Sequence, residues 1–196
     1  MFVVMVEGDT ERALRRHLKS FIDQRALAEG KPRPRLTFKP NMTHEPAALR
    51  RHLAYEFRRG AQAVVGLIDV FPHFQSAADA KTSLTRAAAD DRFIPHAAQY
   101  DVEAWLLPYW SDICQRISVR QQRPGAHPEE INGQKPPAYH LRDLYQRARP
   151  HRKYNKVIEM DQLLEGKDLT LSAAACPEFK ALLNTLLTLS GLTPLP

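Results

Sequence analysis

Cysteine is scarce in this chain, and the two that occur argue against a zinc ribbon or a disulfide framework. Only Cys114 and Cys176 are present among 196 residues, and neither belongs to a Cys-x-x-Cys or Cys/His spacing. Metal-binding and disulfide scaffolds depend on such spacings. Both cysteines stand beside apolar residues, so we expect two buried, reduced thiols.

Long hydrophobic runs are missing as well. No stretch approaches the roughly 18 apolar residues of a membrane span. The apolar run from Phe2 to Val6 is too short for the hydrophobic part of a signal peptide and has no basic flank. Internal repeats and low-complexity segments are also absent. We therefore expect a cytoplasmic protein with no membrane contact, built around one principal domain.

The balance of charge favours a polyanionic partner. Lys and Arg number 28 against 22 Asp and Glu, which gives a formal net charge of +6. Arg15 belongs to one of several arginine pairs, and Arg152 and Lys153 belong to a basic segment nearer the C-terminus. Clustered cations attract nucleic-acid phosphates. The alternative is that these side chains only solvate helix faces.

Short apolar runs alternate with helical patterns along the first half of the chain. Strands are expected over residues 2–6, 35–39, 63–68 and 93–97, and the second of them suits a sheet edge. Between them, apolar residues recur at helical spacing, as in Leu14, Leu18 and Ile22. Strands that alternate with helices of this length predict an α/β sandwich with a mostly parallel central sheet flanked by helices.

Composition divides the chain into three parts. Residues 1–120 are expected to form the α/β core, and residues 121–138, rich in Pro, Gly, Glu, Asn and Lys, an exposed linker or loop. Residues 139–196 read as a helical C-terminal region packed on that core, and Pro177 opens its Leu-rich last helix. The Leu stripe suits the core, with a partner-binding or homodimer surface as the alternative.

Acidic residues follow three of the expected strands. Glu7 follows the first, Asp69 the third, and Asp101 with Glu103 the fourth. The carboxyl ends of parallel strands meet at one sheet edge, where α/β proteins bind ligands. Carboxylates suit Mg²⁺ or Mn²⁺, and with basic helices around them they suit metal-assisted phosphodiester hydrolysis. Taken singly, each acid also fits a turn or a helix cap.

Three segments resemble a known family: Val6-Glu7-Gly8-Asp9-Thr10-Glu11, Leu67-Ile68-Asp69-Val70-Phe71, and residues 99–107. They are similar to a small Toprim-fold family of unknown function (the 4276 family), which is related to the OLD-type nucleases and occurs in bacterial genomes near mobile or defence genes. The likeness continues through residues 154–156 and 176–179, so it covers most of the chain. It implies a Toprim-like sandwich with a helical C-terminal extension.

The resemblance also implies roles for individual acids. Toprim domains bind magnesium through a glutamate after the first strand and a later Asp-x-Asp pair. Glu7 would then be a metal ligand or a general acid or base, and Asp69 a metal ligand. Glu11, together with Asp101 or Glu103, would resemble the additional acids of the nuclease branch.

Phe71 stands where the second aspartate of the Asp-x-Asp pair is expected. Either Asp101 or Glu103 replaces that acid, or the site binds a single metal weakly, or catalysis has been lost. Lys156 resembles a lysine that stabilises charge on the phosphate in nuclease-type Toprim proteins, and the adjacent Tyr154 could stack on a base. A solvated lysine and a half-buried tyrosine are the alternatives.

Two functions therefore remain open at this point. The first is a Mg²⁺- or Mn²⁺-dependent nuclease that acts on DNA or RNA as an effector of bacterial defence. The second is a catalytically impaired nucleic-acid-binding or regulatory subunit that works with a partner such as an ATPase. The fold alone does not decide between them.

Overall fold

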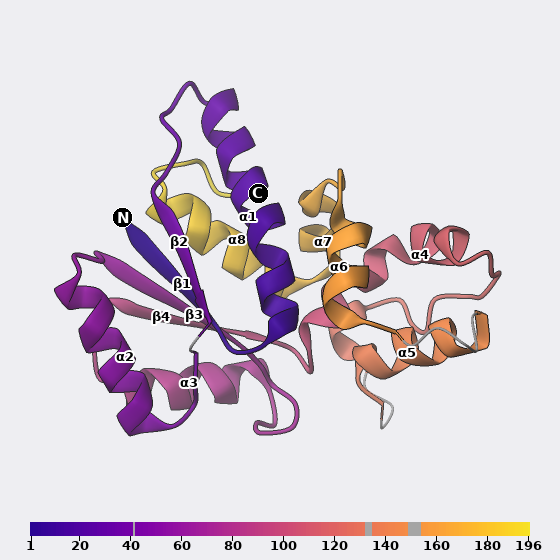
Figure 1. The fold of residues 1–196 in the computed structure, drawn as a ribbon, viewed down its shortest axis with the longest axis horizontal. Helices are drawn as coiled ribbons and strands as arrows, with labels where there is room; N and C mark the ends of the chain where they lie inside the picture. The colour runs from indigo at the N-terminus through magenta and orange to yellow at the C-terminus, as the bar shows by residue number, and fades with distance from the viewer. Residues whose placement is uncertain (41, 132–134, 149–153) are drawn as a thin grey trace.

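A four-stranded parallel sheet forms the centre of the computed structural model (Figure 1). The structure describes residues 1–40, 42–131, 135–148 and 154–196, with the backbone only for residues 9–12. The spatial order is β2-β1-β3-β4, and every neighbouring pair is parallel. This confirms the predicted α/β class and the edge position of the second strand. The strands are β1 (Phe2–Val6), β2 (Leu36–Pro40), β3 (Ala63–Asp69) and β4 (Phe93–Ala98).

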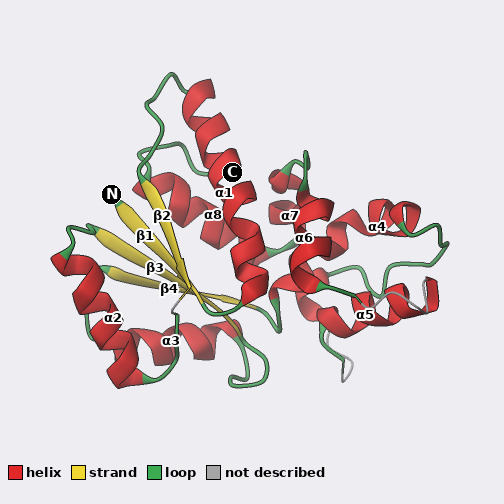
Figure 2. Cartoon of the chain, viewed as in Figure 1, coloured by secondary structure: helices red, strands yellow, loops and turns green. Residues whose placement is uncertain are grey.

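Helices cover both faces of the sheet (Figure 2). α1 (Asp9–Ala28) and α8 (Pro177–Leu189) pack on one face, and α2 (Pro46–Arg58) and α3 (Ala77–Ala88) pack on the other. The connections leave β1 and β3 in opposite directions along the sheet, so the strand order reverses between these two strands. In open α/β sheets, ligands bind beyond the carboxyl ends of the strands at such a reversal.

A helical extension lies beyond the carboxyl ends of the strands (Figure 1). It begins at the 3-10 helix η1 (Val102–Tyr109), where Trp105 stacks on Phe179 of α8 with ring centres 4.6 Å apart. Residues 139–196, which the sequence predicts to be a helical C-terminal region, contribute most of the helices here. The remaining elements are α4 (Trp110–Arg116), η2 (Pro128–Glu130), α5 (Pro137–Ala148), α6 (Lys156–Leu164) and α7 (Leu169–Ala175).

Within residues 121–138, which the sequence predicts to be an exposed connection, one acidic side chain is buried. Glu129 of η2 is buried, accepts a hydrogen bond from Nε1 of Trp105 at 2.9 Å, and accepts another from the backbone N–H of Glu178 at 3.0 Å. Burial raises the pKa of Glu129 above its ordinary value, and these donors oppose the shift. Glu129 is buried because it caps the first turn of α8.

The structure also bears on the predictions made for the two cysteines and for membrane-spanning segments. Cys114 and Cys176 are both buried and free, as predicted. Burial raises the pKa of the Cys176 thiol to about 12, so it stays protonated. Among the helices in the described part of the chain, none is long and apolar enough to cross a membrane.

Candidate active site

The sheet brings the predicted acids to its carboxyl edge, because β1, β3 and β4 are adjacent and parallel. Glu7 directly follows β1, Asp69 ends β3, and Asp101 follows β4. Glu103 lies two residues further on, in η1. The sequence therefore placed these residues at the correct edge.

Asp69 and Asp101 each hold a neighbouring element with one carboxylate oxygen. Oδ1 of Asp69 accepts a hydrogen bond from the backbone N–H of Val102 at 2.9 Å, and Oδ2 of Asp101 accepts one from Ala138 at 3.1 Å. The first bond fixes the start of η1, and the second caps α5. Oδ1 of Asp101 is buried and has no hydrogen-bond partner among the described residues. The capping role therefore accounts for only one of the two Asp101 oxygens.

Glu103 and Lys156 form an ion pair at the centre of the site. Oε1 of Glu103 lies 2.7 Å from Nζ of Lys156, and the Glu103 side chain is 0% exposed. Oε2 of Glu103 is buried without a hydrogen-bond partner in the part of the chain that the structure describes. Burial disfavours the charge on Lys156, but attraction to Glu103, Asp69 and Asp101 outweighs it and raises the lysine pKa. Lys156 thus remains a cation among three acids.

The electrostatics of Asp101 show how crowded with negative charge this edge is. Burial raises the pKa of Asp101 to about 7, and the neighbouring Glu103 carboxylate adds to the shift. The Ala138 N–H and the Lys156 ammonium act in the opposite direction. Nearby carboxylates in a poorly solvated site repel one another, and a bound cation relieves that repulsion.

Tyr154 closes one side of this cluster. Its ring centre lies 5.1 Å from that of Tyr145, and its hydroxyl is buried with no hydrogen-bond partner among the described residues. Burial raises the Tyr154 pKa, and the charge of Glu103 raises it further, so the phenol stays neutral. Tyr154 is thus a half-buried tyrosine that packs on Tyr145, which is the alternative to base stacking given in the sequence analysis.

Glu7 lies beside His44, which in turn packs against His73, and the sequence analysis assigned no role to either histidine. Oε1 of Glu7 lies 3.8 Å from Nδ1 of His44, and the His44 and His73 ring centres are 4.5 Å apart. Their signal was positional: His44 follows β2 and His73 follows β3, so both belong to the same edge as the acids. Standard metal-ligand spacings do not capture that relation.

The other sequence candidates have different outcomes. Arg15 is exposed on α1, and Glu11 lies in the same helix with its side chain outside the described atoms. Arg152 and Lys153 lie outside the described residues. Within the described chain, no three His, Cys, Asp or Glu side chains form a ready metal-binding group. The candidate acids therefore share an edge, but the described ones are not gathered into one cluster of three.

Comparison with known proteins adds a family but no activity. A family model described as "Domain of unknown function (DUF4276)" matches residues 6–187. No curated protein and no solved structure matches the chain. The family match spans β1 to α8 and so includes the whole carboxyl edge. The chain belongs to this family of unknown function.

Proposed function

We propose that the protein is a Mg²⁺- or Mn²⁺-dependent nuclease of the Toprim type, which hydrolyses phosphodiester bonds in DNA or RNA in the course of bacterial defence. The observation that supports this most is the pair Asp101 and Glu103. Both are buried at the carboxyl edge, and each has one oxygen with no hydrogen-bond partner among the described residues. Buried polar atoms normally find partners, so unpartnered carboxylate oxygens suit a bound ligand.

A hard divalent cation fits these oxygens chemically. Magnesium takes oxygen ligands and commonly binds through one or two carboxylates together with substrate phosphates. Asp101 and Glu103 would hold it, with Asp69 and Glu7 at the same edge as the further acids. A metal bound there would activate water and stabilise charge on the phosphoryl oxygens.

Lys156 provides a positive charge that belongs to the chain itself. Its side chain is 35% exposed, so the ammonium is within reach of a ligand while it holds Glu103. A raised pKa keeps it protonated, which suits a hydrogen bond to a phosphate oxygen as negative charge develops there. At the other side of the edge, the Glu7 carboxylate and the His44 imidazole form a pair that can accept or donate a proton.

One observation favours the second candidate, an impaired nucleic-acid-binding or regulatory subunit that acts with a partner such as an ATPase. Phe71, at the position where the Toprim pattern has its second aspartate, is 57% exposed. No carboxylate is supplied there, and Lys156 already neutralises Glu103. This candidate predicts nucleic-acid binding without metal-dependent cleavage.

The test is a titration of Mg²⁺ and Mn²⁺ into the wild type and the variants Asp69→Asn, Asp101→Asn and Glu103→Gln. The amides keep the shape of the side chain and a hydrogen-bond acceptor for Val102 or Ala138. Thermal stability and cleavage of plasmid DNA and RNA are followed in parallel. We expect metal to raise the melting temperature of the wild type, and cleavage to fall by about 100-fold or more in Asp101→Asn and Glu103→Gln.

Asp112→Asn is the matched control. It removes an exposed carboxylate on α4 that pairs with Lys167 at 2.9 Å, away from the sheet edge. This variant should respond to metal and cleave like the wild type. Nucleic-acid binding with no metal response and no cleavage in the wild type would instead support the second candidate.

A further inference from the structure

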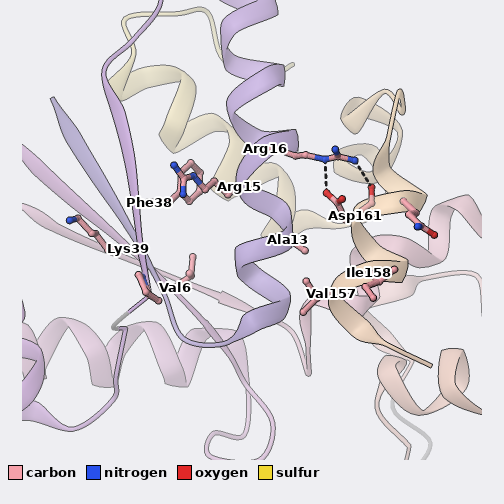
Figure 3. Close-up of a pocket in the computed structure, with 11 residues that line it drawn as sticks. Val6, Ala13, Arg15, Arg16, Phe38, Lys39, Val157, Ile158 and Asp161 are labelled. Carbon is pink, nitrogen blue, oxygen red and sulfur yellow. Dashed lines mark hydrogen bonds and ion pairs between the residues drawn. The ribbon is translucent and has the colours of Figure 1, made fainter. Parts of the chain in front are cut away.

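A groove lies between the end of β2, the first half of α1 and the start of α6 (Figure 3). Its volume is about 640 Å³. Val6, which directly precedes Glu7, and Val157, which directly follows Lys156, both line it. The groove therefore begins one residue away from Glu7 and from Lys156 along the chain, although none of the four acids is among the residues that line it.

One side of the groove carries unneutralised positive charge. Arg15 of α1 is exposed, and Lys39 of β2 is half-buried. Neither has an ion pair to a described residue, whereas the neighbouring Arg16 is held by Asp161 of α6 at 2.5 Å. Figure 3 shows that pair joining α1 to α6, with Arg15 and Lys39 on the β2 side. The two cations are thus available to an anion that enters the groove.

The opposite side of the groove, formed by α6, carries two exposed apolar side chains beside Asp161 and Gln162. Val157 and Ile158, on the first turn of α6, are 37% and 47% exposed. Phe38 of β2, on the same side as Arg15 and Lys39, adds a further apolar surface to the lining (Figure 3). Apolar side chains left exposed beside free cations suit a ligand that has both a charged and an apolar part.

We propose that this groove binds a single-stranded stretch of nucleic acid and directs it to the carboxyl-edge acids. Arg15 and Lys39 contact its phosphates, and Val157 and Ile158 contact an unstacked base. A duplex offers phosphates but keeps its base faces stacked, so it would leave the exposed apolar side chains of α6 unused; a single strand satisfies both sides. The inference rests on the proposed function, because the nuclease activity is what gives the bound strand a purpose. Binding itself requires no cleavage.

The experiment measures binding apart from catalysis. Fluorescence anisotropy is recorded with labelled 12-nucleotide single-stranded DNA, single-stranded RNA and duplex DNA, in EDTA and at several salt concentrations. In Arg15→Ala/Lys39→Ala we expect single-strand affinity to fall by about tenfold, and the slope of log affinity against log salt to fall by about 1.4, the value for two lost phosphate contacts. Val157→Ser/Ile158→Ser should weaken single-strand binding and leave the weaker duplex binding unchanged.

Arg51→Ala/Arg86→Ala is the control for overall charge. These exposed arginines lie on α2 and α3, which cover the other face of the sheet. Their loss should change single-strand affinity by less than about twofold. The inference is overturned if this pair weakens binding as much as the groove pair, if the groove variants bind like the wild type, or if duplex DNA binds as tightly as single strands.

The result is also separable from the nuclease proposal. When Mg²⁺ is added to the same oligonucleotides, groove-dependent binding without cleavage would contradict the nuclease and retain the groove. Cleavage that the groove variants leave unchanged, with unchanged affinity, would retain the nuclease and contradict the groove.

Discussion

Two groups of buried glutamates in this molecule differ in how completely they are hydrogen-bonded. Within the helical extension, Glu129 receives a donor on each oxygen, and Glu159 accepts from the Tyr145 hydroxyl at 2.8 Å. At the sheet edge, Glu103 is just as buried but has a lysine on one oxygen and no described partner on the other. Both groups are buried, but only the glutamates of the helical extension have hydrogen-bond donors that account for their burial.

The difference separates structural from functional carboxylates. A buried acid whose oxygens all accept hydrogen bonds contributes to the fold, because its removal leaves buried donors without an acceptor. A buried acid with an unused acceptor leaves free energy to be gained from a ligand. On this criterion Glu129 is structural, whereas Glu103 and Asp101 fit the proposed metal site.

The largest expected effect tests the structural half of the comparison. Glu129→Ala should lower the free energy of unfolding by about 3 kcal/mol, because Nε1 of Trp105 and the N–H of Glu178 lose their acceptor. Glu103→Gln should change it by less than about 1 kcal/mol, because Lys156 is partly exposed and can be solvated. Urea unfolding in EDTA measures both values, and Glu129→Gln, which keeps one acceptor, should lie between them. Equal losses at the two positions would break the comparison.

A second test concerns a buried nitrogen without a hydrogen-bond partner outside the acidic cluster, and its effect on how stability depends on pH. His96 of β4 bonds Oγ1 of Thr185 through Nε2 at 3.0 Å, and its Nδ1 has no partner among the described residues. Burial lowers the His96 pKa to about 4, with a smaller contribution from the charge of Lys81. Because this value is below that of the unfolded chain, protonation favours unfolding. The stabilisation is complete above pH 6.5 or so and is lost as the pH falls towards 4.

The expected size is about 2 kcal/mol of stability lost between pH 7.5 and pH 5 through His96. Urea unfolding at the two pH values, compared between the wild type and His96→Gln, isolates the contribution. The variant should lose less stability than the wild type over that interval. An identical pH dependence would mean that His96 does not remain neutral in the folded protein.

The smallest effect sharpens the functional half of the comparison. Phe71→Asp restores the second acid that the Toprim pattern contains and adds a carboxylate beside Asp69. We expect Mg²⁺ affinity to rise by about tenfold, equivalent to roughly 1.4 kcal/mol, as measured by calorimetry. Phe71→Ala, which removes the same exposed ring without adding charge, should leave the affinity unchanged. A gain in both variants would attribute the effect to the ring and not to the acid.

The sequence predicted the sheet and the position of its acids because both depend on local pattern. The run from Phe2 to Val6 is apolar throughout, which is typical of a strand covered on both faces, and Glu7 marks its end. The same reasoning located Asp69 and Asp101. Once the strands are parallel, their carboxyl ends necessarily share an edge.

The remaining features depend on contacts between distant parts of the chain. The pairing of Glu103 with Lys156, and the approach of His44 to Glu7, require the final packing of α6 and of the loop after β2. Glu129 lies in a segment whose Pro-, Gly- and polar-rich composition indicates exposure, yet it caps α8 through a contact that composition cannot show. Local pattern thus found the edge but not the partners of its side chains.

Helix α6 places successive residues in three environments. Lys156 at its start contacts Glu103, Val157 and Ile158 face the groove, and Asp161 ties the helix to α1 through Arg16. Any ligand that displaces this nine-residue helix while it occupies the groove also moves the ammonium away from the acids. By thermodynamic reciprocity, the factor by which a strand in the groove alters cation affinity equals the factor by which the cation alters strand affinity. Helix α6 is therefore the element through which the two proposed sites would be coupled.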